Sequence, residues 1–288
     1  MAEKLQTITE LRRHVAHLLS DLWQQPEAEA MASVIIGEYT GMGSARQLAF
    51  GDQGADPETV RMVLSAAGRA AEGEPLQYIF GYTMFLGHRI EVGPGVLIPR
   101  PETEELTSLI ISENKGFKGL ATDICTGSGC IAIALSLAFP EATVYGADNS
   151  QKALRTAARN VIANGAGVSL IPLDILSQPS GAIEQSNLIV SNPPYVTESE
   201  KGMMHVNVTD HEPHEALFVP DSDPLLFYRY LVKTADERLA ADGSIYLEAN
   251  EAFAEEAARL FNPSRYREIK VMADIRGKQR FIKAVKNG

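Results

Sequence analysis

The tetrapeptide Asn192-Pro193-Pro194-Tyr195 has the clearest chemical content in this sequence. It directly follows the apolar run 187–191, which has the character of a buried strand. Because proline has no N–H and cannot continue a central strand, the strand must end here. The asparagine side chain and the proline carbonyls are therefore presented as hydrogen-bond acceptors at the carboxyl edge of a sheet, where open α/β folds bind ligands.

A second polar segment, Asp123–Gly129, follows another strand pattern and opens a helical one. Its two glycines, Gly127 and Gly129, allow a tight turn and a close approach of a ligand to the backbone. Asp148 ends the next strand pattern, where an acidic side chain can accept hydrogen bonds from ribose hydroxyls. The third glycine of a dinucleotide loop and the lysine of a P-loop are both missing. The pattern therefore favours a nucleoside-containing cofactor without phosphate.

The elements that position these residues alternate between strand and helix. Apolar strand patterns occur at 120–125, 143–148, 168–173, 187–192 and 243–248, with helical patterns at 131–139, 150–163 and 225–240 between them. After a helix at 250–262, the last two strands, 266–273 and 280–285, are joined by a turn too short for a parallel crossover, so we expect them to be antiparallel. This order predicts an α/β fold with a doubly wound sheet. Seven strands that end in a hairpin resemble the class I, Rossmann-like fold of S-adenosylmethionine-dependent methyltransferases.

We expect three regions along the chain. Residues 1–73 carry short amphipathic helical patterns, which predict a small helical domain. We expect this domain to recognise the substrate. Residues 74–94 contain two aromatic and β-branched runs around Gly81 and Gly87, which predict a β-hairpin linker. Residues 95–288 would form the methyltransferase domain.

Composition excludes several classes of protein. The 288 residues include 26 Lys and Arg against 37 Asp and Glu, a net charge of −11, which disfavours binding nucleic acid mainly through phosphates. Two cysteines are too few for a secreted disulfide scaffold. The first residues are charged and amphipathic, unlike a signal peptide, and no apolar run reaches the about 18 residues of a membrane span. We therefore expect a cytoplasmic protein that does not bind membranes.

Several motifs occur together in an order that resembles one enzyme family. They are Glu74–Ile79, Leu97–Glu104, Asp123–Gly129, Asn192–Tyr195, and Glu212-Pro213 with Ala216-Leu217. The chain resembles the peptide chain release factor N5-glutamine methyltransferases, the bacterial PrmC/HemK family. That resemblance implies transfer of a methyl group from S-adenosylmethionine, leaving S-adenosylhomocysteine, to the glutamine of the Gly-Gly-Gln motif in release factors. Cys125 departs from the family, which commonly has glycine at that position.

The expected chemistry assigns a role to each residue of the tetrapeptide. An amide nitrogen is a weak nucleophile because its lone pair is delocalised into the carbonyl. Acceptors on its two N–H groups would localise that lone pair, and Asn192 Oδ1 and the Pro193 carbonyl are the candidates. Tyr195 would pack on the flat amide, and Pro194 would complete the substrate-binding set. We thus expect Asn192, Pro193 and Tyr195 to be catalytic.

The expected cofactor contacts come from four segments. Asp174 lies where this fold contacts the adenine edge, Ile175 would cover the ring, and Arg100 belongs to a loop that would cover the methionine end. The full expected set is Arg100, Cys125, Thr126, Gly127, Ser128, Gly129, Asp148, Asp174, Ile175 and Asn192.

Two other functions stay open from the sequence. An adenine-N6 or guanine-N2 methyltransferase of nucleic acid would share Asn192–Tyr195, but we would expect it to carry a basic recognition domain. A scaffold that binds a cofactor without catalysis is disfavoured because the motif residues are intact. The segment His211–His214 lacks metal-ligand spacing, so no metal is expected. We expect release factors as protein partners, no direct nucleic-acid contact and a monomer.

Overall fold

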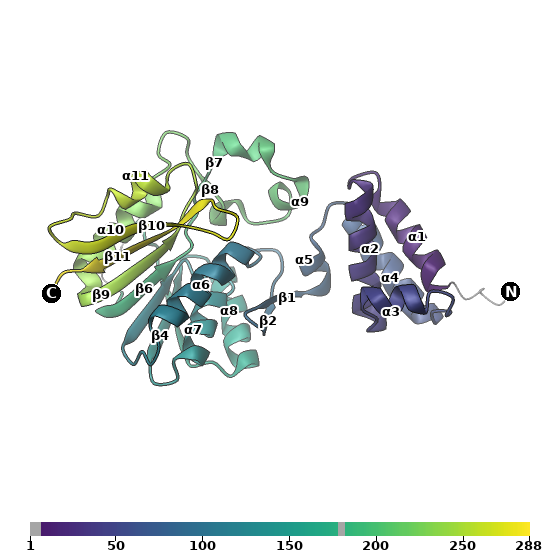
Figure 1. Ribbon diagram of the computed structural model, residues 1–288, viewed down its shortest axis with the longest axis horizontal. Helices are drawn as coiled ribbons and strands as arrows, with labels where there is room; N and C mark the ends of the chain where they lie inside the picture. Colours follow the sequence, from purple (N-terminus) through teal and green to yellow (C-terminus); the bar gives the residue numbers. More distant parts are fainter. Residues whose placement is uncertain (1–6, 178–181) are drawn as a thin grey trace. The chain divides into compact units, whose positions relative to one another are not determined.

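The computed structural model describes residues 7–177 and 182–288. The chain divides into two compact units (Figure 1). One contains the chain up to Gly81 together with His205–His211, and the other contains Tyr82–Met204 and Glu212–Gly288. The domain limits expected at residues 73 and 94 remain a prediction.

The smaller unit is helical. Its first helix begins with a capping box, in which the Thr7 hydroxyl accepts from Glu10 N at 3.2 Å and Glu10 Oε2 accepts from Thr7 N at 3.0 Å. Ile8, Leu11, Val15 and Leu19 on this helix are buried in one apolar cluster with the other helices. The helices are α1 (Ile8–Leu19), α2 (Gln25–Thr40), α3 (Ser44–Ala49), α4 (Pro57–Ala71), α5 (Leu76–Phe80) and α9 (Val206–Thr209).

The segment expected to form a hairpin linker is part helix and part hairpin. The first of its two runs, Leu76–Phe80, is the short helix α5, so the expectation of a strand there is wrong. Gly81 ends this helix with φ of +79°, a left-handed conformation that suits a helix C-terminus. The hairpin follows as β1 (Tyr82–Phe85) and β2 (His88–Glu91), which pair antiparallel around a tight turn.

The larger unit contains the seven-stranded sheet that the sequence predicted. The strands lie in the order β10-β11-β9-β6-β3-β4-β5. β3, β4, β5, β6 and β9 are parallel to their neighbours in this group, whereas β11 is antiparallel to both β9 and β10. The strands are β3 (Leu120–Ile124), β4 (Thr143–Asp148), β5 (Val168–Pro172), β6 (Ser186–Ser191), β9 (Leu239–Glu248), β10 (Tyr266–Ala273) and β11 (Gln279–Lys286).

Helices cover both faces of this sheet (Figure 1). Because side chains alternate between faces along a strand, Ile245 and Leu247 of β9 join one apolar cluster with α10 and α11. Tyr246 between them faces the other side, where its hydroxyl donates to Glu113 Oε2 of α6 at 2.6 Å. The helices of this unit are α6 (Pro101–Glu113), α7 (Cys130–Ala138), α8 (Gln151–Asn164), α10 (Leu226–Arg238) and α11 (Ala254–Ala258). No helix within residues 7–177 and 182–288 is long and apolar enough to cross a membrane.

A short parallel strand pair holds the chain after the Asn-Pro-Pro-Tyr motif. β7 (Val196–Thr197) pairs with β8 (Phe218–Val219), and Leu217 O accepts from Tyr195 N at 3.2 Å and Val196 N at 2.9 Å. The 3₁₀ helices η1 (Glu198–Met203) and η2 (His214–Ala216) lie between these strands in the sequence. The motif therefore leads into a bonded segment rather than a free loop.

Asn160 of α8 ties the hairpin to the glycine-rich turn. Its fully buried side chain accepts from Glu91 N at 2.7 Å and donates to Glu91 O at 3.0 Å and to Ser128 O at 2.9 Å. One amide thus satisfies three backbone groups from segments that are distant in sequence.

We expect Asn160→Ala to lower the free energy of unfolding by about 3 kcal/mol, because it leaves buried backbone groups without partners. Urea unfolding followed by circular dichroism measures this. Asn164→Ala is the matched control on the same helix, since Asn164 makes a more exposed bond to Arg89 O of the same hairpin; it should cost no more than about 0.5 kcal/mol. Equal losses in the two variants would contradict the assigned role of Asn160.

Candidate active site

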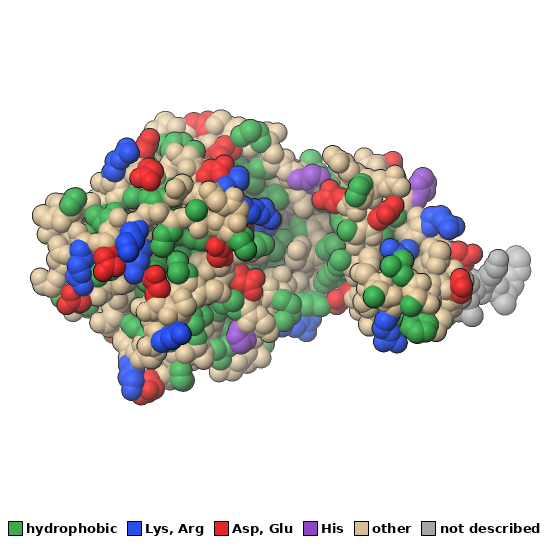
Figure 2. Space-filling view, viewed as in Figure 1, with side chains coloured by type: hydrophobic (Ala, Val, Ile, Leu, Met, Phe, Trp, Pro, Cys, Tyr) green, Lys and Arg blue, Asp and Glu red, His purple; other side chains and the backbone are tan. Residues whose placement is uncertain are grey.

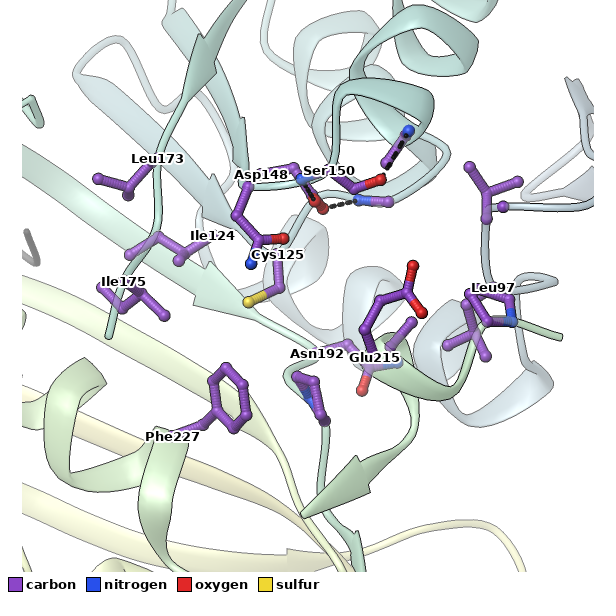
Figure 3. Close-up of a pocket in the computed structure, with 18 residues that line it drawn as sticks. Leu97, Ile124, Cys125, Asp148, Ser150, Leu173, Ile175, Asn192, Glu215 and Phe227 are labelled. Atoms are coloured by element: carbon purple, nitrogen blue, oxygen red, sulfur yellow. Dashed lines mark hydrogen bonds between the residues drawn. The ribbon is translucent and has the colours of Figure 1, made fainter. Parts of the chain in front are cut away.

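A cavity opens at the carboxyl edge of the parallel strands in the larger unit (Figure 3). It has about 680 Å³ of empty volume, including the open solvent at its mouth. Its walls come from the ends of β3, β4 and β6, the segment after β5, helix α10 and two loops. The lining residues are Gly95, Val96, Leu97, Ile124, Cys125, Gly127, Asp148, Asn149, Ser150, Ala153, Leu173, Ile175, Asn192, Pro194, Pro213, Glu215, Ala216 and Phe227.

Asp148 is fixed at the end of β4 by backbone donors. Its Oδ2 accepts from Gly127 N and its Oδ1 from Ser150 N, both at 2.9 Å (Figure 3). Burial raises the pKa of this carboxyl, although these bonds oppose the shift. Each oxygen keeps a second lone pair, so the side chain can still accept from a ligand hydroxyl in the cavity.

The glycine-rich turn is built on a buried acid. Asp123 is fully buried, and its Oδ2 accepts from Thr126 Oγ1 at 2.6 Å and from Ala132 N at 3.2 Å. Its Oδ1 has no hydrogen-bond partner among the described residues. Burial raises the pKa of Asp123 to about 7. This acid therefore anchors the turn from below and does not line the cavity.

Asn192 lies where β6 ends, with its side chain beside the cavity (Figure 3). The preceding residue, Ser191, donates its hydroxyl to Ile124 O at 2.6 Å and so holds the ends of β6 and β3 together. Asn192 Nδ2 donates to Thr103 Oγ1 at 2.9 Å. The described residues offer no donor to Asn192 Oδ1, which leaves this oxygen available to a ligand.

Tyr195 anchors the other end of the motif. Its hydroxyl donates to Glu248 Oε1 at 2.9 Å, and its ring packs against the apolar cluster of α10 and the sheet. Burial and the nearby Glu248 carboxylate raise the pKa of the Tyr195 hydroxyl well above its usual range. Tyr195 does not line the cavity, and neither does Pro193, whereas Asn192 and Pro194 do.

Only some of the residues expected to contact the cofactor line the cavity. Cys125, Gly127, Asp148, Ile175 and Asn192 line the cavity. Five others are outside its lining: Arg100, Thr126, Ser128, Gly129 and Asp174.

Each of these five has a different role in the structure. Thr126 holds Asp123, Ser128 O accepts from Asn160, and Gly129 caps α7 with φ of +82°. Asp174 is exposed and accepts from Leu176 N at 3.0 Å. The guanidinium of Arg100 pairs with Glu212 Oε1 at 2.6 Å, while Glu212 Oε2 accepts from Ile98 N at 3.0 Å. A cofactor contact by Arg100 has no support from this placement.

Sequence reasoning missed several residues of the site. Leu97, Ser150, Glu215 and Phe227 line the cavity (Figure 3), and Glu248 lies behind Asn192. The place of Glu248 at the site could have been predicted from the sequence, because it ends a predicted parallel strand at the same edge of the sheet as Asp148.

The cavity combines acidic and apolar walls. Glu215 adds a second carboxylate beside Asp148 and contributes to the raised pKa of that group. Two acids favour a ligand that carries positive charge, while Leu173, Ile175 and Phe227 form an apolar side suited to a flat ring. Within the described residues, no three His, Cys, Asp or Glu side chains are grouped to hold a metal ion.

Two family models match this chain. One is described as PrmC N-terminal domain and covers residues 10–81, and the other is described as methyltransferase small domain and covers residues 101–211. A release factor glutamine methyltransferase of Bacteroides thetaiotaomicron is 40% identical over 271 residues, which are 94% of this chain and 97% of that protein. The chain belongs to the release factor glutamine methyltransferase family. The resemblance inferred from the motifs is thereby confirmed.

Further relatives agree with this family and fold. The release factor glutamine methyltransferase of Flavobacterium psychrophilum is 43% identical over 216 residues, covering 74% of this chain and 75% of that protein. A crystal structure of a methyltransferase from Pyrococcus furiosus matches with a TM-score of 0.50 and 19% identity, over 70% of this chain and 90% of that one. That likeness concerns the fold, and the predicted methyltransferase fold is confirmed.

Cys125 has a φ of +62°, a left-handed backbone conformation that side chains rarely adopt. Substitutions at this position test how strongly the turn requires that conformation. We expect Cys125→Gly to change the free energy of unfolding by less than about 1 kcal/mol, since relief of the left-handed strain offsets the lost side chain. Cys125→Val should cost about 2 kcal/mol or more, because a β-branched residue tolerates positive φ poorly. Thermal unfolding measures both variants. A valine variant as stable as the glycine variant would contradict the constraint.

Asp123 should make stability depend on pH. Its carboxyl binds a proton more tightly in the folded chain, so its contribution to stability falls as pH rises from about 4 to about 7. Asp123→Asn removes this fall, so its stability relative to the wild type should rise across that window by about 1 kcal/mol per pH unit. Urea unfolding at several pH values measures the difference.

Asp56 provides a control of opposite sign. The hydrogen bonds from Thr59 at the start of α4 lower the pKa of Asp56. Its carboxylate therefore stabilises the fold above its unfolded pKa, and Asp56→Asn should lose stability relative to the wild type as pH rises through the acidic range. A difference between Asp123→Asn and wild type that does not change with pH would refute the role of burial at Asp123.

Proposed function

We propose that this protein transfers a methyl group from S-adenosylmethionine to the side-chain nitrogen of the glutamine in the Gly-Gly-Gln motif of peptide chain release factors. The observation that supports this most directly is the fixed orientation of Asn192 at the cavity. Its amide nitrogen is already bonded to Thr103, so its oxygen is the group left to meet a substrate.

A neutral acceptor at this place suits an amide substrate. The side-chain nitrogen of the substrate glutamine has two N–H groups. One would donate to Asn192 Oδ1 and the other to the Pro193 carbonyl. These two hydrogen bonds would hold the lone pair of the nitrogen directed toward the methyl donor. As the nitrogen gains positive charge during attack, hydrogen bonds to its N–H groups strengthen from about 1 kcal/mol toward about 2–3 kcal/mol each. These acceptors therefore stabilise the transition state more than the bound substrate. A strong base is not required first, because the methylated nitrogen readily loses its proton afterwards.

The cavity fits the proposed cofactor by the chemistry of its walls. Asp148 would accept from the ribose hydroxyls, and Ile175 and Phe227 would cover the adenine ring. The carboxylates of Asp148 and Glu215 would attract the positively charged methionine end. When bound, S-adenosylmethionine supplies an electrophilic methyl group, and its product is S-adenosylhomocysteine. We propose that no metal takes part.

The proposed partner is a protein rather than a nucleic acid. On the face of the larger unit seen in Figure 2, acidic and basic side chains are interspersed. Together with the net charge of −11, this distribution disfavours a phosphate-binding surface. We propose that the helical N-terminal region recognises the release factor, and that the protein acts as a cytoplasmic monomer.

Asn192→Ala should reduce methyl transfer by at least about 100-fold, because it removes the acceptor that orients the amide. The cofactor dissociation constant should change by no more than about threefold. Transfer of radiolabelled methyl from S-adenosylmethionine to a purified release factor measures the first quantity, and calorimetric titration measures the second.

Asn187→Ala is the matched control, since it makes the same change at the opposite end of β6. It should leave methyl transfer near the wild-type rate. Parallel reactions contain DNA or RNA in place of the release factor. Label on nucleic acid alone would overturn the proposed function, and full activity of Asn192→Ala would overturn the assigned mechanism.

A further inference from the structure

A buried chain of hydrogen bonds runs behind Asn192, away from the cavity. Asn192 Nδ2 donates to Thr103 Oγ1 at 2.9 Å, and Thr103 Oγ1 donates to Glu248 Oε2 at 2.7 Å. Thr103 lies in the first turn of α6 and is 3% exposed, and Glu248 ends β9 with no exposure at all. Neither residue lines the cavity.

The direction of this chain follows from counting donors. An ionised carboxylate only accepts, so the single hydroxyl proton of Thr103 must point toward Glu248. The oxygen of Thr103 then has only lone pairs to offer Asn192. The Asn192 amide must therefore present its nitrogen to Thr103, and its oxygen is turned away from it, toward the cavity.

Two hydroxyl donors hold Glu248 as the acceptor at the end of these hydrogen bonds. Tyr195 donates to its second oxygen at 2.9 Å, so both carboxylate oxygens receive a hydroxyl proton. Burial raises the pKa of Glu248 and the charge of Glu102 adds to that shift, whereas the hydrogen bonds from Thr103 and Tyr195 and the charge of Arg280 oppose it. The same carboxylate thus holds Tyr195 directly and Asn192 through Thr103.

We propose that Thr103 and Glu248 are positioning residues that fix the orientation of the Asn192 amide for methyl transfer. Without the threonine hydroxyl, Asn192 Nδ2 would have no acceptor on its buried side. The amide would then rotate to place its NH₂ group in the polar cavity, where it would repel the N–H groups of a substrate amide. The effect of these residues on catalysis rests on the proposed function. The orientation of the Asn192 amide rests only on its hydrogen bonds in the structure.

Thr103→Val tests the proposal, because valine keeps the shape of threonine and removes the hydroxyl. We expect kcat for release factor methylation to fall by about 10- to 100-fold. KM for the release factor and the cofactor dissociation constant should stay within about threefold of wild type. Thr103→Ser restores the hydroxyl and should recover kcat to within about threefold.

Thr107→Val is the matched control one turn further along α6. Thr107 is equally buried, but its hydroxyl donates at 2.8 Å to the backbone carbonyl of Thr103 and not to the site. It should keep the wild-type kcat. A fall in kcat of equal size in Thr107→Val, or a wild-type kcat in Thr103→Val, would overturn the proposal. Weaker cofactor binding with unchanged kcat in Thr103→Val would also overturn it.

Glu248→Gln tests the donor-to-acceptor direction of the hydrogen bonds that run from Asn192 through Thr103 to Glu248. A glutamine amide can donate to Thr103 and thereby free its hydroxyl proton for the Asn192 oxygen, so kcat should again fall. Because both residues act through one chain, the double variant Thr103→Val/Glu248→Gln should lose little more than Thr103→Val alone. Losses that multiply would reject a common path. Should Glu248→Gln fail to fold, the valine and serine variants still decide the question.

A readout without catalysis separates this proposal from the proposed function. Hydrogen exchange of the Asn192 side-chain amide, followed by NMR with ¹⁵N-labelled asparagine and assigned through Asn192→Ala, should be at least about tenfold faster in Thr103→Val than in wild type. Unchanged exchange would reject the positioning of the amide. Faster exchange in a protein whose wild type methylates no release factor would reject the proposed function and leave the positioning intact.

Discussion

Four neighbouring strands carry a polar group at one edge of the sheet, and the site depends on keeping these groups there. Across β9, β6, β3 and β4 they are Glu248, Asn192, Asp123 and Asp148. Because these strands are parallel, their carboxyl ends meet on one side. Burying a polar group is unfavourable unless it is hydrogen-bonded, and each of the four is hydrogen-bonded to a residue of another helix, strand or turn. The polar edge thus fixes the turns, the first helical turn of α6 and the cavity wall together.

Burial of these acids has a cost that the rest of the fold offsets. Desolvation raises the pKa of Asp123, Asp148 and Glu248 alike, so their charged forms destabilise the folded chain near neutral pH. The apolar cluster that the sheet forms with α10 and α11 supplies opposing stabilisation. In return, a buried carboxylate is an acceptor with fixed direction, since water does not compete for its lone pairs. The buried carboxylates thus orient their hydrogen-bond partners precisely, but their desolvation lowers the stability of the folded chain.

Most of the fold could be predicted because its signals are local. The strands at 143–148 and 266–273 have the expected bounds, and the antiparallel end of the sheet followed from one short turn. The capping box at Thr7 is equally local, because its partner Glu10 lies only three residues away. Hydrogen-bonded pairs whose members lie far apart in the sequence could not be predicted. Arg100 meets Glu212, 112 residues away, and Asn192 meets Thr103, 89 residues away, and neither pair has a period or a spacing that marks it.

The residue type at position 192 follows from the buried network as much as from any substrate. Thr103 has one proton and gives it to Glu248, so the neighbour of Thr103 on the cavity side must be a donor. An aspartate there would add a second carboxylate to the same hydroxyl and would have no proton to give. A serine could donate, but it would lack a second, separate acceptor atom for the cavity. An amide donates at one end and accepts at the other without titrating near neutral pH. Asparagine, which is shorter than glutamine, places both ends between Thr103 and the cavity on a backbone that Pro193 keeps rigid.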